Sequence, residues 1–385
     1  MREITESEVV GIVDHFRDLP DPRSTVNRVH LLVDVIVISV CGVIAGADGP
    51  TAIEVWAKSQ VEWLKKHLKL PNGIPSHDTI GRVLERLSPQ AFQRCFAAWL
   101  ESLGGQADGD SDRRPHLAID GKTARRSHDR RRGLGPLHVV SVWATERGIA
   151  LGQLATEEKS NEITAIPQLL EDLDIGGAII TIDAAGCQKN IAERIINGKA
   201  DYVLALKGNQ GNLHKAVEDW IVEHMADDFA GMRVSRWEEQ ETSHGRTDHR
   251  TYYQLTAPPD LPGRGSWIGL KTVGIAIRVS EKDGKETSDV RFYISSLRRN
   301  GKQFARAVRG HWGIENSLHW SLDMTFREDD SRTRGRRIAD NLAWLRRIAL
   351  TLLKQHPKKQ SLVMKRRMAG WNVNFLMQVL TGNHT

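Results

Sequence analysis

The chain has 385 residues, of which 26% are charged and 40% hydrophobic, and its formal net charge is +6. A chain of this length and composition can bury a sizeable core and is expected to form two or three domains. Its three cysteines are few, odd in number and without metal-ligand spacing, which argues against a disulfide framework or a zinc finger and favours a reducing cytoplasm.

No export signal or membrane span is expected. The N-terminus is charged and lacks a secretory apolar segment. The one long apolar stretch, residues 31–47, contains Asp34 and is shorter than the roughly 20 apolar residues that cross a bilayer. We therefore expect a buried helix at this stretch and a cytoplasmic protein without a membrane partner.

The apolar pattern predicts further helices up to about residue 105. One passes through Ile53 and Leu64, and another, through Ile80 and Leu87, has Ser76 or Asp78 as its candidate N-cap. The Ser–Pro pair at residues 88–89 ends that helix and begins the next.

These helices allow two interpretations. A helix-turn-helix would direct Arg82 and Arg86 toward a DNA groove, but a plain helical bundle is favoured over it. The glycine-rich residues 104–110 then predict a flexible linker.

From residue 116 the pattern changes to alternating strands and helices. Strands are predicted at residues 117–120, 139–144, 149–155, 178–183 and 202–206, with helices at 163–173 and 190–196. From about residue 209 to 297 the sequence has β patterns, for example at 250–255 and 272–277, separated by turn signals. We expect Trp237 and Trp267 in this stretch to pack in a core or interface rather than stack on an unpaired base.

Two of the predicted strands end in an aspartate, Asp120 and Asp183, and Glu315 follows far downstream in a helical pattern. An acid at the end of a strand that is buried on both faces lies in the crevice where ligands of open α/β sheets bind. Magnesium prefers hard oxygen ligands, usually a few carboxylates with waters and substrate phosphates. The three acids are therefore the ligand set of a two-metal phosphodiester enzyme.

The helix that carries Glu315 has two faces. Phe304, Val308 and Trp312 recur every fourth residue as a packing stripe, while His311, Glu315 and His319 follow another line. A His-Glu-His face also suggests zinc, but the two upstream aspartates favour magnesium or manganese. A final amphipathic helix at residues 338–352 is expected to close the core.

Positive charge is clustered along the chain. The clusters are Arg125–Arg126, Arg130–Arg132, Arg332–Arg337 and Lys365–Arg367. A solvated surface explains any single cluster equally well. Their summed field favours a polyanionic partner, because neutralised phosphates release counterions.

Five segments, in their order along the chain, resemble those of bacterial insertion-sequence transposases of the DDE type, and most of all the H-repeat-associated branch. They are residues 118–122, 181–188, 202–210, 243–246 and 309–316. Any one of them is common, but five in the family's order are specific and spread over nearly the whole chain.

The resemblance implies an α/β fold with an RNase H-like core. This core is a mixed five-stranded sheet with helices, with a β-rich insertion before the last catalytic helix and an all-α N-terminal domain. The expected boundaries are 1–108 for the N-terminal DDE-associated, DNA-binding domain, 114–385 for the catalytic domain and about 209–297 for the insertion. The first and fourth strands of such a core are neighbours, which places Asp120 beside Asp183.

The resemblance also implies the site and its partners. Asp120, Asp183 and Glu315 are the expected ligands of Mg²⁺, for which Mn²⁺ substitutes, and the expected partner is DNA at the inverted repeats and the target, bound by a homodimer. The expected DNA contacts are Lys122, Arg125, Arg126, Lys207, His244, Arg246, Arg250, Arg309, His311 and His319. Many relatives have Tyr, Arg and Lys where this chain has Val308, His311 and Leu322, which leaves the route of second-strand cleavage open, and Arg309 is a candidate substitute for one of them.

Three other functions compete with DNA strand transfer. An NTPase would need a glycine where the phosphate-binding loop begins, but the chain has His116 there. A DNA-binding regulator, such as an inactive copy, fits the basic charge but leaves the three acids unexplained. A nuclease of the same fold that cuts without joining shares every ligand, so only strand-transfer products separate it from a transposase.

Overall fold

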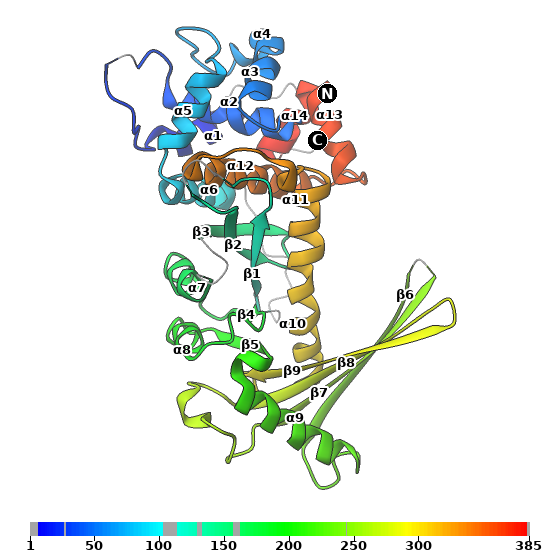
Figure 1. The fold of residues 1–385 in the computed structure, drawn as a ribbon. Coiled ribbons are helices and arrows are strands. Elements are labelled where there is room, and N and C mark those ends of the chain that lie inside the picture. Colours follow the sequence, from blue (N-terminus) through cyan, green and yellow to red (C-terminus); the bar gives the residue numbers. More distant parts are fainter. Residues whose placement is uncertain are drawn as a thin grey trace.

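The computed structural model describes residues 7–26, 28–102, 114–128, 133–156, 162–243 and 245–382. Helices from both ends of the chain form one layer, a nine-stranded sheet flanked by helices forms the next, and the far ends of four long strands project from the body (Figure 1). The predicted linker at 104–110 and the cluster Arg130–Arg132 lie outside the described residues.

The N-terminal part of the described chain is helical, as predicted. Its helices are α1 (Ser7–Arg17), α2 (Leu32–Ile44), α3 (Pro50–Ser59), α4 (Val61–Leu64), α5 (His77–Arg86) and α6 (Pro89–Ser102). Helix α2 is buried along nearly its whole length, which confirms the expectation for the long apolar stretch. Its Asp34 accepts a hydrogen bond from the backbone N–H of Leu70 at 2.9 Å. Ser76 caps α5 by accepting a hydrogen bond from the N–H of Thr79.

The sheet contains the five predicted strands and four more. The strands are β1 (His116–Ala124), β2 (Leu137–Ala144), β3 (Ile149–Thr156), β4 (Ile179–Ile182), β5 (Asp201–Leu206), β6 (Val234–Ser243), β7 (Arg246–Thr256), β8 (Thr272–Lys282) and β9 (Lys285–Ser295). Their order is β3-β2-β1-β4-β5-β9-β8-β7-β6. Strand β1 pairs in parallel with β4, so the prediction that the first and fourth strands are neighbours is confirmed.

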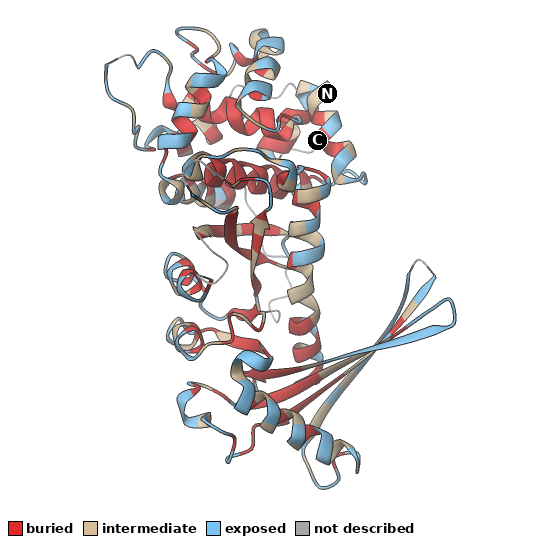
Figure 2. Ribbon diagram, in the orientation of Figure 1, coloured by how far each residue is buried: buried red, intermediate tan, exposed pale blue. Residues whose placement is uncertain are grey.

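The β-rich insertion differs from the expected addition to a five-stranded core. Strand β9 pairs antiparallel with β5, so that β6–β9 continue the same sheet, which has nine strands. Near the body, β7, β8 and β9 are buried and β6 is partly exposed, whereas the far ends of the four strands are mostly exposed (Figure 2). We call β6–β9 the arm.

Helices cover both sides of the sheet (Figure 1). Helices α7 (Glu162–Glu171) and α8 (Lys189–Asn197) lie on one side, α10 (Gly301–Gly313) lies on the other, and α9 (Gly211–Met225) packs on β9. Short 3₁₀ turns occur at Gly208–Gln210, Arg264–Ser266 and Glu328–Asp330.

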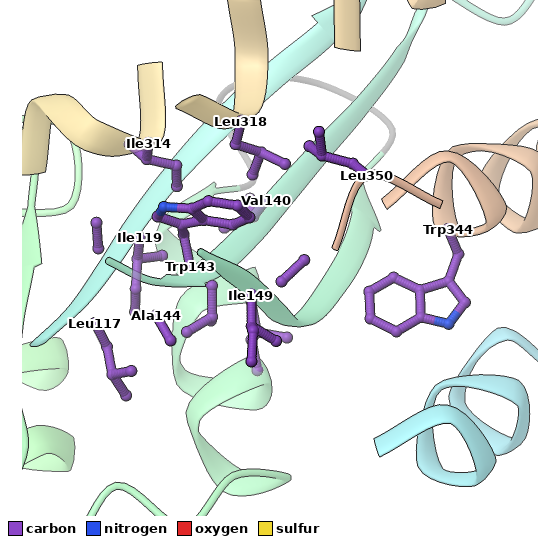
Figure 3. Close-up of a cluster of buried hydrophobic side chains, with 14 of the residues drawn as sticks. Leu117, Ile119, Val140, Trp143, Ala144, Ile149, Ile314, Leu318, Trp344 and Leu350 are labelled. Carbon is purple, nitrogen blue, oxygen red and sulfur yellow. The ribbon is translucent and has the colours of Figure 1, made fainter. Parts of the chain in front are cut away.

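Helix α10 continues without a break through a π-helical segment (Ile314–His319) into α11 (Trp320–Met324). Near its start, the buried Phe304 packs where a side chain at Gly274 of β8 would overlap its ring, so the glycine permits close contact between helix and arm. Further along, the buried Ile314 and Leu318 point toward Trp143 of β2 (Figure 3). This continuous helix, residues 301–324, which we call the rod, is therefore anchored to the arm near its start and to the central sheet further along.

The C-terminal helices join the N-terminal ones. They are α12 (Arg336–Gln355), α13 (Leu362–Trp371) and α14 (Val373–Thr381). Helix α12 closes the core, as predicted, and its Asn341 side chain donates hydrogen bonds to the carbonyls of Leu84 and Leu87 at 2.7 and 3.1 Å.

The basic cluster Lys365–Arg367 near the C-terminus is mostly buried, which corrects both interpretations of it, a solvated surface and a surface for a polyanionic partner. Lys365 and Arg366 are buried. Arg366 donates to the carbonyl oxygens of Val43 and Thr325, because a buried guanidinium needs acceptors for its hydrogens. The cluster therefore joins parts of the helical layer, and two of its three charges are removed from the surface available to a polyanion.

Candidate active site

The sheet register brings two of the predicted acids to the same level. Ile119 on β1 pairs with Ile182 on β4, so Asp120 and Asp183 are the next residues on two adjacent parallel strands. Beyond the end of β4 the chain turns, and the Asp183 carboxylate accepts hydrogen bonds from the N–H groups of Ala185 and Gly186 at 3.0 and 3.3 Å. These bonds fix the carboxylate at the edge of the sheet.

Glu315 reaches the same region from the helical rod. It is exposed within the π-helical segment, while its neighbours Ile314 and Leu318 are buried against the sheet. A π-helical turn inserts an extra residue and changes the direction of the side chains, a device that recurs at functional sites. Asp183 and Glu315 line one cavity of about 640 Å³.

The three acids repel one another. Burial and the charges of Asp183 and Glu315 raise the pKa of Asp120 to about 7. Three carboxylates offer the hard oxygen ligands that a divalent cation prefers, and such a cation would relieve this repulsion. Within the described ranges, however, no three His, Cys, Asp or Glu side chains are placed closely enough to hold a metal ion. The three acids therefore have the donor atoms and the negative charge that suit a divalent metal ion. Their side chains would have to move closer together to bind one.

Two histidines of the rod lie next to the acids. His311 shares a hydrogen bond of 3.2 Å with Thr181, and burial lowers the pKa of His311 to about 4. His319 lies 3.5 Å from an Asp120 oxygen, and burial lowers its pKa to about 3. Both rings are therefore neutral at pH 7 and are able to offer a hydrogen bond without adding charge. His116 shares a hydrogen bond of 2.9 Å with the same Thr181 hydroxyl.

Lys122 lies in a buried ionic cluster. Its ammonium group is 2.7 Å from Asp323, 3.1 Å from Asp329 and 3.7 Å from Glu328. The neighbouring Arg125 and Arg126 are exposed and pair with the same acidic turn, Glu328–Asp330. The structure thus separates the buried lysine from the two arginines that solvent reaches.

The remaining predicted DNA contacts lie after β5, on the arm and on α10. Lys207 is exposed just after β5, and His244 lies outside the described residues. Arg246 and Arg250 on β7 are 3.2 and 2.6 Å from Asp248, and Arg309 on α10 pairs with glutamates of β6. The structure brings these three arginines together along one cavity, whereas Lys207 lines the cavity of Asp183 and Glu315.

Two further arginines, which the sequence alone did not single out, complete this group. Arg278 on β8 lies directly opposite Arg250, and Arg291 on β9 lies with its guanidinium 4.0 Å from the centre of the Trp312 ring. The alternation of side chains along each strand indicates which residues share a face of that strand. Only the register between strands shows which of them become neighbours. Trp267 is buried and Trp237 partly so, which agrees with the predicted packing roles.

Comparisons with known proteins agree with the resemblance found in the sequence. The profile of the transposase DDE domain family matches residues 111–352, and a profile described as DDE_Tnp_1-associated matches residues 13–100. The chain is 40% identical over 377 residues to "Putative transposase YncI" of Escherichia coli O157:H7, which covers 97% of this chain and 95% of that protein. It is 38% identical over 382 residues to "H repeat-associated putative transposase YhhI" of Escherichia coli K12, which covers 98% and 99%.

Among solved structures, the similarity is distant. The piggyBac transposase synaptic complex with hairpin DNA matches with a TM-score of 0.41 and 11% sequence identity, covering 98% of this chain and 78% of that chain. Within the described part of the chain, no helix is long and apolar enough to cross a membrane.

Proposed function

The chain belongs to the transposase DDE domain family, and on this premise we propose that it cuts DNA at the ends of an insertion sequence and joins those ends to a target. The observation that carries the proposal is that the strand register brings Asp120 and Asp183 to the same level of two adjacent strands, while Asp183 and Glu315, from distant parts of the sequence, line one cavity. These carboxylates concentrate negative charge, which attracts a divalent cation, and a bound cation would offset the repulsion between the carboxylates and a phosphate.

We also propose that the body of the sheet is an RNase H-like core. The order β3-β2-β1-β4-β5, with β1 between an antiparallel and a parallel neighbour, supports it. In this proposal residues 1–108 form a DNA-binding domain, and the catalytic domain includes the arm.

Asp120, Asp183 and Glu315 would hold Mg²⁺ or Mn²⁺. When bound, the metal supplies activation of the attacking hydroxyl and stabilisation of the leaving oxygen. The chain's own groups orient the substrate. The neutral His311 and His319 offer hydrogen bonds beside the acids, and the exposed Arg125, Arg126 and Lys207 would contact phosphates on either side.

The direct test uses the purified protein with Mg²⁺, a labelled fragment carrying the ends that flank its own gene, and a supercoiled target plasmid. We expect cleavage at the element boundary and joined products, both lost in EDTA. Asp120→Asn and Asp183→Ala should abolish cleavage, because each removes a metal ligand, but keep DNA binding, because neither removes a cationic side chain. Glu193→Gln, an exposed acid on α8, is the matched control and should remain active.

The same assay separates the competing functions. Cleavage without joined products would identify a nuclease of the same fold. Binding to the ends without any cleavage, in Mg²⁺ or Mn²⁺, would identify a regulator and overturn the proposed chemistry. Activity of the wild-type protein in EDTA would contradict the metal requirement.

A further inference from the structure

A second cavity, of about 330 Å³, lies between the arm and the helical rod. Five arginines line it, together with Trp312 and Asn316, and we call it the arm groove; the arginines are Arg246, Arg250, Arg278, Arg291 and Arg309. Arg291, Tyr293 and Trp312 also line the cavity that contains Asp183 and Glu315. The arm groove is therefore continuous with the candidate active site.

The strand register explains why the arginines gather on one face. Glu239 on β6 lies opposite Arg250 on β7, Arg250 lies opposite Arg278 on β8, and Arg278 lies opposite Asp289 on β9. Like charges directly opposite each other on adjacent strands destabilise a sheet. The buried Asp248 compensates, since it lies within 3.4 Å of both Arg250 and Arg278.

Two glutamates on the edge strand β6 form ion pairs with Arg309 and Arg250 of the groove. Arg309 on α10 is 3.2 Å from Glu239 and 3.0 Å from Glu241, and Glu241 is also 3.2 Å from Arg250. The hydrogen bond and charge of Arg309 hold the pKa of Glu241 below its usual range. The side chains of Glu239 and Glu241 are 29% and 50% exposed, so they can turn into solvent without leaving a buried charge.

The charge balance depends on these two glutamates. The five arginines contribute +5, and the carboxylates of Glu239, Glu241, Asp248 and Asp289 contribute −4, which leaves +1. If Glu239 and Glu241 turn away, the groove has +3. Carboxylate and phosphate present similar oxygen acceptors to a guanidinium, which binds either of them with two parallel hydrogen bonds.

We propose that the arm groove binds the phosphate backbone of DNA as it leaves the active site, and that Glu239 and Glu241 occupy Arg309 and Arg250 until DNA displaces them. This inference rests on the proposed function. It adds to that function the path of the DNA, two further arginines that contact it, Arg278 and Arg291, and two glutamates that compete with it. Arg278 and Arg291 are 41% and 32% exposed, and each is accessible from the groove.

The test measures the affinity for a short fluorescein-labelled duplex of mixed sequence by anisotropy, over a series of KCl concentrations. Arg278→Ala/Arg291→Ala should bind several-fold more weakly, and its log–log salt slope should be smaller by about 1.8, since each lost phosphate contact removes about 0.9. Arg278→Lys/Arg291→Lys should keep the slope. Arg194→Ala, an ion-paired arginine on α8, should leave both quantities unchanged.

The glutamates give a second test of opposite sign. Glu239→Gln/Glu241→Gln should bind the duplex several-fold more tightly than wild type. Glu171→Gln/Glu193→Gln changes the net charge equally at a remote surface, so it controls for the general field. An equal gain in both double variants, or weaker binding after the change at 239 and 241, would overturn the proposed competition.

Each remaining outcome is decisive. If the Arg278→Ala/Arg291→Ala protein loses its circular-dichroism signal, the single change Arg246→Ala, at a half-exposed side chain, replaces it and should lower the slope by about 0.9. If the wild-type protein cuts DNA and the arginine variants bind it normally, DNA binding by the arm groove is refuted, but the proposed function is not. Wild-type protein that binds no DNA would refute the proposed function as well.

Discussion

Two networks of charged side chains surround the candidate active site, and they differ chiefly in burial. On the helical side, Glu328 accepts a hydrogen bond from Arg347 at 3.0 Å and lies 3.7 Å from Lys122, and all three side chains are buried. On the arm side, Glu239 and Glu241 hold Arg309 at the surface. The pairing chemistry is the same in both. A buried pair cannot exchange its partner without leaving a bare charge in the interior, whereas an exposed pair can.

The largest effect should come from breaking the buried network. Glu328→Gln leaves the side chain of Arg347 and the ammonium group of Lys122 without their shared carboxylate, which should lower the free energy of unfolding by about 3–5 kcal/mol. Urea unfolding followed by circular dichroism measures this. The double change Glu328→Gln/Arg347→Met should recover part of the loss. A loss below about 1 kcal/mol for the single variant would mean that water reaches the network around Glu328. The two networks would then not differ in burial as described.

The same carboxylate predicts how stability depends on pH. Burial alone would raise the pKa of Glu328, but the charges of Arg347, Lys122 and Arg346 outweigh it and hold the pKa below its ordinary value of 4.5. A group whose pKa is lowered on folding stabilises the protein above its unfolded pKa, and that stabilisation is lost as pH falls through the folded value. The free energy of unfolding should therefore decrease as the pH falls below about 4.5. This decrease should be shallower in Glu328→Gln; equal slopes would assign it to other carboxylates.

Sequence patterns predicted the acids of the candidate site but neither of the two charged networks around it. The five strands of the body, and the pairing of the first with the fourth, followed from short apolar runs such as Ile179–Ile182, because a buried strand has a strong local signal. The acids Asp120 and Asp183 could be located because they end such runs. The position of Arg278 opposite Arg250 could not, since it depends on the register of two strands joined by a long connection.

Burial of charge was also beyond the sequence. Arg366 looks like part of a basic surface cluster, and only the packing of α13 against the chain near Val43 shows that its hydrogens are used by carbonyl oxygens. Likewise, Lys122 follows Asp120 closely in the sequence, yet its partners lie some two hundred positions downstream. Neither partner set has any local pattern.

An intermediate effect is expected at the one buried acid of the arm. Asp248 lies 2.6 Å from Arg250 and 3.2 Å from Arg246, and it also accepts a hydrogen bond from Ser280. Asp248→Asn removes the charge but keeps the shape, so we expect a loss of about 1–3 kcal/mol in the free energy of unfolding, less than for Glu328→Gln. Thermal unfolding compares the two variants directly. An equal or larger loss for Asp248→Asn would show that the ion pairs of the arm contribute as much to stability as the buried network around Glu328.

The smallest effect should accompany the exposed glutamates, and this result decides whether the arm can release them. Glu239→Gln/Glu241→Gln should change the free energy of unfolding by no more than about 1 kcal/mol, because pairs between exposed side chains contribute little and salt screens them. Urea unfolding at low and high KCl measures this change in the free energy of unfolding and its dependence on salt. Any loss of stability should vanish at high salt. A larger, salt-independent loss would mean that the two glutamates hold the arm against α10 as part of the fold. Tighter DNA binding by that variant would then reflect a loosened arm, whereas unchanged stability with tighter binding leaves competition for the same arginines as the physical cause.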